Sequence, residues 1–189
     1  MNGLAYTYDD DVVTELIDGV IVAMSSPTLK HNVAVFAITK IFDSYLKGKS
    51  CQVIQAFNVN LTKKDRLVPD VLVVCNKEIV KDDAVYGAPD LVVEVLSPTT
   101  EKRDRGYKKK LYEKFGVREY WLVDTHKRSI EVYYNADGVL DLHDIYQIYP
   151  DYVVKNMTDA QRDAVVDEFK TSIFDDLMIK VADVFEGVV

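Results

Sequence analysis

The chain is poor in cysteine, and this bounds the chemistry it can carry. Cys51 and Cys75 are its two cysteines in 189 residues. Each falls in an apolar, strand-like run, so we expect two free thiols that pack as small hydrophobic side chains. Neither CxxC spacing nor a histidine cluster accompanies them, which argues against a zinc site.

Long apolar runs are absent as well. No stretch approaches the roughly 20 apolar residues that span a bilayer, so we expect no membrane association. The first residues, MNGLAYTYDDD, are acidic and lack the apolar run of a signal peptide. Together with the few cysteines, these features predict a soluble protein in the reducing cytoplasm.

Positive charge is also scarce, since the formal net charge is −8. This balance argues against a general nucleic-acid binder. One segment, from Glu101 to Arg118, carries eight Lys and Arg against three acids, a local charge of +5 on a remainder near −13. Such an island marks either a binding face or the solvated flank of a helix, and charge alone favours the flank.

What the chain has is enough apolar material for the core of one domain, at 48% hydrophobic residues. We expect one domain over 1–189, with an N-terminal hairpin and helix in 1–50, a core in 51–135, and strands with a trimming segment in 136–189. Asp18-Gly19 is typical of a hairpin turn. Apolar residues from Val33 to Tyr45 recur at helical spacing, and Gly48 is a suitable helix end.

The remaining pattern alternates strands and helices. It predicts strands at 51–62, 71–75, 91–96, 120–123, 130–134 and 139–149, and helices at 104–115, 158–169 and 181–185. The residues 76–88 read as a polar loop. This order predicts an α/β or α+β fold in which helices flank one mixed sheet.

A carboxylate stands in the middle of the most apolar of these strands. Glu94 lies within LVVEVL, and strand alternation puts it on one face with Val92 and Leu96. Asp70, at the entrance of an earlier strand, reaches the same place if the two strands are neighbours. Two buried carboxylates repel each other, and a divalent cation such as Mg²⁺ resolves this. The alternative is structural: Glu94 pairs with an arginine or lysine and has no role in catalysis.

The helix after Pro98 bears on that choice. Asp104, Lys108, Leu111, Tyr112 and Phe115 follow helical spacing along one side. Because Lys108 shares its stripe with apolar residues, it is the lysine expected to lean toward the sheet. His31 stands near the start of the first helix, where a hydrogen-bonded structural histidine is the simpler reading. His126, in a turn, and His143, in a late strand, suggest no site.

Several motifs together resemble a known family. Pro69-Asp70, EVLSPTT at 94–100, then Asp104, Lys108 and Tyr112, and GVREYWLVD at 116–124 are similar to the Uma-two restriction endonuclease family of the PD-(D/E)XK nuclease superfamily. ELIDG at 15–19, His31 and the ending from Phe174 to Phe185 match the pattern too.

The resemblance implies a restriction-endonuclease-like core in which Asp70 and Glu94 bind the metal. The superfamily pattern has a lysine two residues after the second acid, where this chain has Leu96. Lys108 matches the position to which the lysine has moved in this family. Glu15 matches an N-terminal acid that could supply a third carboxylate, although an exposed hairpin residue explains it equally well. His31, Asp104 and Tyr112 are secondary candidates.

The implied activity is hydrolysis of DNA phosphodiester bonds with Mg²⁺ or Mn²⁺. Residues of the basic segment would contact the DNA backbone without reading its sequence, namely Lys102, Arg103, Arg105, Lys109 and Lys110. Cutting both strands favours a homodimer with two sites related by a two-fold axis. The alternative function is a catalytically inactive module with the nuclease fold that binds nucleic acid or protein. A hydrolase for another phosphate ester is a third reading.

Overall fold

The computed structural model describes residues 12–188. Residues 1–11, on which the expectation about a signal peptide rests, and residue 189 lie outside that part. No helix in the described part of the chain is long and apolar enough to cross a membrane.

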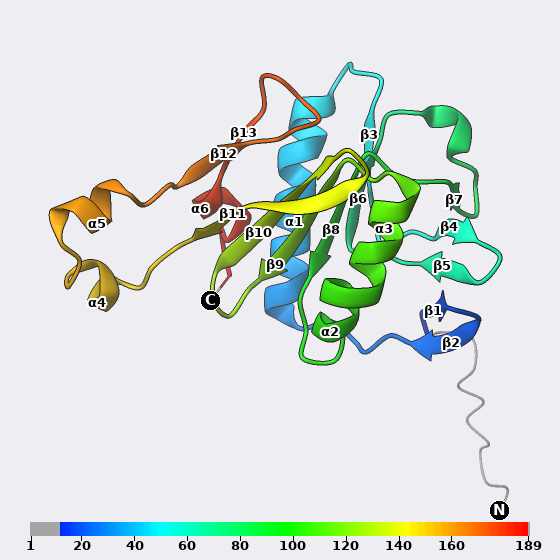
Figure 1. Cartoon of the computed structure of the whole chain (residues 1–189), viewed down its shortest axis with the longest axis horizontal. Helices are drawn as coiled ribbons and strands as arrows, with labels where there is room; N and C mark the ends of the chain where they lie inside the picture. Colours follow the sequence, from blue (N-terminus) through cyan, green and yellow to red (C-terminus); the bar gives the residue numbers. More distant parts are fainter. Residues whose placement is uncertain (1–11, 189) are drawn as a thin grey trace, which may run out of the picture.

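A mixed six-stranded sheet forms the centre of the fold (Figure 1), with the strand order β11-β10-β9-β8-β6-β3. Only β8 and β9 run parallel among the neighbours of this sheet, and the other pairs are antiparallel. Its strands are β3 (Gln52–Gln55), β6 (Val71–Val74), β8 (Leu91–Val95), β9 (Glu119–Asp124), β10 (Ser129–Ala136) and β11 (Val139–Gln147). The predicted mixed α/β architecture is confirmed.

Helices cover both faces of this sheet (Figure 1). On one face lies α1 (Leu29–Leu46), whose buried side chains Ala34, Ile38 and Phe42 pack in one cluster with Val93 and Trp121. The other face carries α2 (Glu101–Arg103), the π-helical segment η2 (Asp104–Lys108) and α3 (Lys109–Phe115) in succession. Strand alternation therefore sends Glu94 toward the second set of helices.

A second sheet of five strands, ordered β2-β1-β5-β4-β7, contributes its apolar side chains to the core on the α3 side. Asp18 and Gly19 join β1 to β2 with φ of 48° and 80°, as the hairpin prediction requires. The strands are β1 (Thr14–Ile17), β2 (Val20–Ala23), β4 (Val59–Thr62), β5 (Asp65–Leu67) and β7 (Val85–Tyr86). This sheet matters for the site because β1 carries Glu15.

Three predicted elements were wrong. The strand expected at 51–62 is two strands in different sheets, because the chain turns at Ala56 with φ of 44°. The loop at 76–88 contains a 3-10 turn, η1 (Lys77–Ile79), and β7. The helix expected at 158–169 ends early: α5 (Asp159–Asp163) buries no side chain that could stabilise a longer helix.

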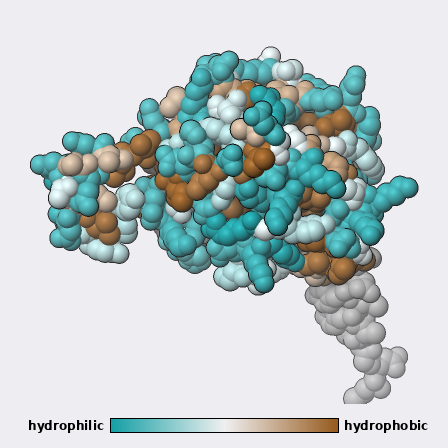
Figure 2. All heavy atoms as spheres, viewed as in Figure 1, coloured by the Kyte–Doolittle hydropathy of each residue, from teal (hydrophilic) through white to brown (hydrophobic). Residues whose placement is uncertain are grey.

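The C-terminal part adds short elements around this core. After α4 (Asp151–Val154) and α5, which project from the body in Figures 1 and 2, the chain returns through β12 (Glu168–Lys170), β13 (Met178–Lys180) and α6 (Val181–Val184). Phe169 of β12 is buried, and its ring centroid lies 5.1 Å from that of Trp121. Trp121 is itself fully buried and belongs to the core.

The prediction of free cysteines was also wrong, because Cys51 and Cys75 form a disulfide. β3 and β6 pair antiparallel with Gln52 opposite Val74, so the next pair in the register is Cys51 with Cys75. Sequence spacing gave no sign of this pairing, since 24 positions separate the two residues.

Candidate active site

Asp70 and Glu94 meet at one edge of the central sheet. β6 and β8 pair antiparallel with Val71 opposite Val93, which makes Asp70 and Glu94 the next pair in the register. Directly opposed residues have Cβ atoms about 5 Å apart. Asp70 Oδ2 accepts a hydrogen bond from the backbone N–H of Val95 at 2.7 Å, which fixes its carboxylate beside Glu94.

Lys108 reaches Glu94 from the opposite helix. Its Nζ lies 3.1 Å from Glu94 Oε1, 2.8 Å from Glu15 Oε1 and 3.2 Å from Asp104 Oδ1. The Tyr112 hydroxyl donates to the same Glu94 oxygen at 3.0 Å. All five residues are at most 3% exposed, so the amine is a buried centre shared by three carboxylates.

The local helix geometry positions the amine. The turn from Asp104 to Lys108 is π-helical, and such turns frequently occur at functional sites. The carbonyl of Asp104 accepts from the N–H of Lys109 and also from the Tyr120 hydroxyl, at 3.0 Å. Arg105 anchors the same turn to β10 through Glu131, with 2.5 Å between Nη1 and Oε2.

Burial and charge set the protonation of this cluster. Burial alone would lower the pKa of Lys108, but Glu94, Asp104 and Glu15 outweigh it and raise the pKa, so the amine stays cationic. Burial raises the pKa of Glu94 well above its usual range; Lys108 opposes this, while Asp104, Asp70 and Glu15 add to it. The crowding of carboxylates around one amine therefore favours proton uptake by Glu94.

His31 contacts the other acid of the site. Its Nε2 lies 3.2 Å from Asp70 Oδ1, and its backbone N–H donates to Thr28 Oγ1, the N-cap of α1. Burial lowers the pKa of His31. The hydrogen bond and the charge of Asp70 raise that pKa by more, so the net effect is an increase. The structure therefore places this secondary candidate against Asp70, where it orients the carboxylate.

A pocket of about 590 Å³ opens onto these groups. Asp70, Glu94 and Lys108 contribute to its wall. The N-terminal end of α1, the turn after β8 and the end of β9 supply most of the rest, including the polar side chains of Thr28, Ser97, Thr99, Thr100, Thr125 and His126.

His126 is a lining residue that the sequence reasoning set aside. β8 and β9 run parallel, so their carboxyl ends reach the same edge of the sheet. The turn containing Thr125 and His126 therefore lies beside the turn containing Ser97 and Thr100, in the place where α/β sheets bind ligands. No local sequence pattern marks His126, because its place in the pocket depends on the pairing of β8 with β9.

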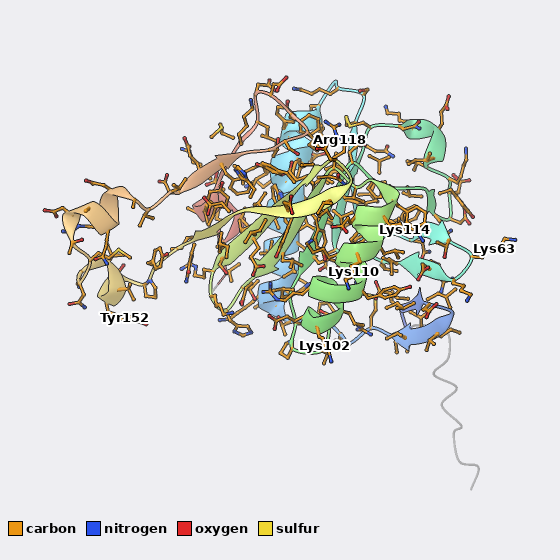
Figure 3. The ribbon with its side chains drawn as sticks, viewed as in Figure 1. Lys63, Lys102, Lys110, Lys114, Arg118 and Tyr152 are labelled. Atoms are coloured by element: carbon orange, nitrogen blue, oxygen red, sulfur yellow. A yellow bond between two sulfur atoms is a disulfide. The ribbon has the colours of Figure 1, made fainter. Side chains whose placement is uncertain are left out.

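The five basic residues predicted to contact the DNA backbone fall into two groups. Arg105 is engaged by Glu101 and Glu131, and Lys109 by Glu113 and the carbonyl of Leu140, so these two cations serve the fold. Lys102 and Lys110 are exposed along the outer side of the helix (Figure 3), and Arg103 is partly buried. The prediction for the first group is revised, since their charges are already neutralised by neighbours.

The donor set decides which metal the site could hold. Within residues 12–188, no group of three or more His, Cys, Asp or Glu side chains is arranged to hold a metal ion, and Glu15, Glu94 and Asp104 converge on the Lys108 amine instead. Asp70 and Glu94 alone suit Mg²⁺ or Mn²⁺, because such ions take one or two carboxylates and keep several waters. A cation between Asp70 and Glu94 would also relieve the repulsion of these two carboxylates. The residues therefore fit an ion completed by water and substrate oxygens, and do not fit an all-protein cage.

Comparison with known proteins identifies the family and the fold. The model of the Uma2 family, described as "Putative restriction endonuclease", matches residues 4–162. An uncharacterised protein of Synechocystis sp. is 35% identical over 132 residues, covering 66% of this chain and 67% of the relative. The crystal structure of a "putative nuclease" from Anabaena variabilis has a TM-score of 0.70 at 19% identity, covering 93% of this chain and 91% of that one, and shows the same fold. The chain belongs to the Uma2 family.

Proposed function

We propose that this protein is a Mg²⁺-dependent endonuclease that hydrolyses phosphodiester bonds of DNA. The observation that carries the proposal is the convergence of Asp70, Glu94 and the Lys108 amine on one pocket. Family membership supports the nuclease class. The metal and the DNA substrate are our inference from the donor set and the chemistry it suits.

The roles of the residues follow from their protonation. Asp70 and Glu94 would hold the ion, which when bound polarises the phosphate and lowers the pKa of a bound water. Lys108 is unsuited to be a general base, because its neighbours raise its pKa and keep it charged. Its positive charge instead offsets the negative charge that develops on the phosphate in the transition state. Tyr112 and Glu15 hold Glu94 and Lys108 in place.

The test is cleavage of circular DNA, which has no ends for an exonuclease to use. Purified protein is incubated with supercoiled duplex and with circular single-stranded DNA, each with Mg²⁺ or Mn²⁺. The proposal is supported if the wild-type protein cleaves the DNA and the Asp70→Ala and Glu94→Gln variants do not. Equal cleavage by these variants identifies a contaminating nuclease, and no cleavage of either circle contradicts the proposal.

A second function, binding without hydrolysis, is favoured by one observation. Glu94 Oε1 is already engaged by both Lys108 and Tyr112, as in a purely structural ion pair. Calorimetric titration with Mn²⁺ separates the two, because only the nuclease requires the ion. A homodimer stays a prediction tied to duplex cleavage, and a cytoplasmic location stays a prediction as well.

A further inference from the structure

We infer that the pocket admits an unpaired nucleotide of a single DNA strand and excludes an intact duplex. This inference rests on the proposed function and specifies its substrate. It follows from three properties of the site: how deeply the reacting groups lie, what lines the pocket, and where the free cations are.

The reacting groups are recessed. The side chains of Asp70, Glu94 and Lys108 are 14%, 4% and 2% exposed. A phosphate must therefore enter the pocket to meet them, and a volume of about 590 Å³ is of the size that holds a small organic ligand. Enzymes that take a whole nucleotide into a pocket act on single strands or on flipped nucleotides, because a duplex keeps each nucleotide paired and stacked.

The lining combines two kinds of side chain that suit a nucleotide. Apolar side chains, including Val35, Val68 and Pro98, offer contact to a base or sugar. Hydroxyl groups, including those of Thr28 and Thr99, can donate to phosphate oxygens. Among the described lining residues there is no Phe, Tyr or Trp, so the pocket offers a base apolar contact without aromatic stacking.

The distribution of cations opposes duplex binding. Duplex affinity depends on several Lys or Arg side chains that contact successive phosphates. Within the part of the chain that the structure describes, Lys108 is the one Lys or Arg that lines the pocket, and three carboxylates surround it. Lys110 and Lys114 are exposed on the outer side of α3 (Figure 3) and are absent from the pocket lining. A single strand needs one site per cut, so the two-fold argument for a dimer is not required.

Cleavage rates on matched substrates test the inference. A fluorescein-labelled strand of about 20 nucleotides is incubated with the protein and Mg²⁺, once as a single strand and once annealed to its complement. We expect cleavage of the single strand to be at least tenfold faster. Equal or faster cleavage of the duplex overturns the inference and leaves the proposed nuclease function intact. If neither form is cleaved, the nuclease function is contradicted. The inference about the pocket is then decided by the binding measurement below.

Binding without cleavage gives the independent readout. The Asp70→Asn variant removes one negative charge at constant shape, and its affinity for both labelled DNAs is measured by fluorescence anisotropy. Adding Asn32→Trp, at an exposed lining position of α1, should weaken single-strand binding about tenfold. The matched control is Ser44→Trp, at an exposed α1 position outside the pocket, which should have no effect. The inference is overturned if Asn32→Trp leaves the affinity for the single strand unchanged, or if the duplex binds more tightly than the single strand.

Discussion

Lys108 Nζ lies 3.1 Å from Glu94 Oε1, although Lys108 belongs to a helical turn and Glu94 to a strand. The position two residues beyond Glu94 on the same strand face is Leu96, which is buried in the apolar cluster against α3. The amine that a strand lysine would have supplied therefore arrives from the facing helix. Its placement depends on the packing of that helix, and so on contacts remote from the pocket.

Lys108→Met should remove most of the activity. Loss of one charged group that stabilises a transition state typically costs about 10²–10³-fold in rate. Three buried carboxylates would also lose their partner, so the free energy of unfolding should fall by about 3–5 kcal/mol. Rates are measured at low temperature, with circular dichroism to verify folding. Lys110→Met, on the exposed side of the same helix, is the control, and a folded, fully active Lys108→Met would refute the assignment.

Glu94→Gln should weaken cation binding by more than tenfold while keeping the shape of the side chain. An amide is a neutral and poorer ligand than a carboxylate for hard cations. Mn²⁺ affinity is measured by calorimetry on the folded variant and on wild-type protein. Glu168→Gln, at an exposed position of β12, is the matched control. If wild type and Glu94→Gln bind Mn²⁺ equally, Glu94 is a structural partner of Lys108 and the metal assignment is wrong.

Glu131→Gln should destabilise the protein in a pH-dependent way. Burial raises the pKa of Glu131, but the hydrogen bonds from Arg105 and Tyr133 lower it more, for a net decrease. A group with a depressed folded-state pKa stabilises the fold above its unfolded pKa and loses this effect as the pH falls through the folded value. We expect a deficit of about 1 kcal/mol at pH 7, since the pair is partly solvated.

Thermal melts of Glu131→Gln and wild type from pH 7 to pH 3 measure this difference. The gap in Tm should be full at pH 6–7 and should close below about pH 4, after the carboxylate takes up a proton. A gap that is constant with pH would show that the substitution acts through packing and not through the ion pair. Because Arg105 anchors the π-helical turn, a modest loss of activity should accompany the loss of stability.

Much of the fold could be predicted from the sequence, because the local hydrophobic patterns agree with the packing of the elements. The apolar run around Glu94 and the helical stripe with Lys108 predicted which faces meet. The motif resemblance linked them to Asp70 and Glu15, and the structure brings these side chains together. His31 was expected to be structural on local grounds, yet its ring contacts Asp70 across the edge of the sheet.

Features that depend on register between distant segments were not predictable. The disulfide follows from the pairing of β3 with β6, which no local pattern encodes. His126 follows from the parallel pairing of β8 with β9, which places two turns side by side. The neutralisation of Arg105 requires Glu131 from another element, so charge counting along the chain overstated the free positive charge.

Reduction of the Cys51–Cys75 disulfide should lower stability without changing the site. Closing a loop across 24 positions stabilises a protein by about 3 kcal/mol, mainly by restricting the unfolded chain. Asp70 and Cys75 flank opposite ends of β6, roughly 16 Å apart at the rise of an extended strand. The hydrogen bond from Val95 and the pairing with β8 hold Asp70 independently of the disulfide.

We therefore expect a lower Tm with dithiothreitol but unchanged Mn²⁺ affinity. In a Cys51→Ser, Cys75→Ser variant the Tm should no longer respond to reductant. Loss of Mn²⁺ binding on reduction would show that the end of the sheet carrying Asp70 depends on a covalent tie at the other end.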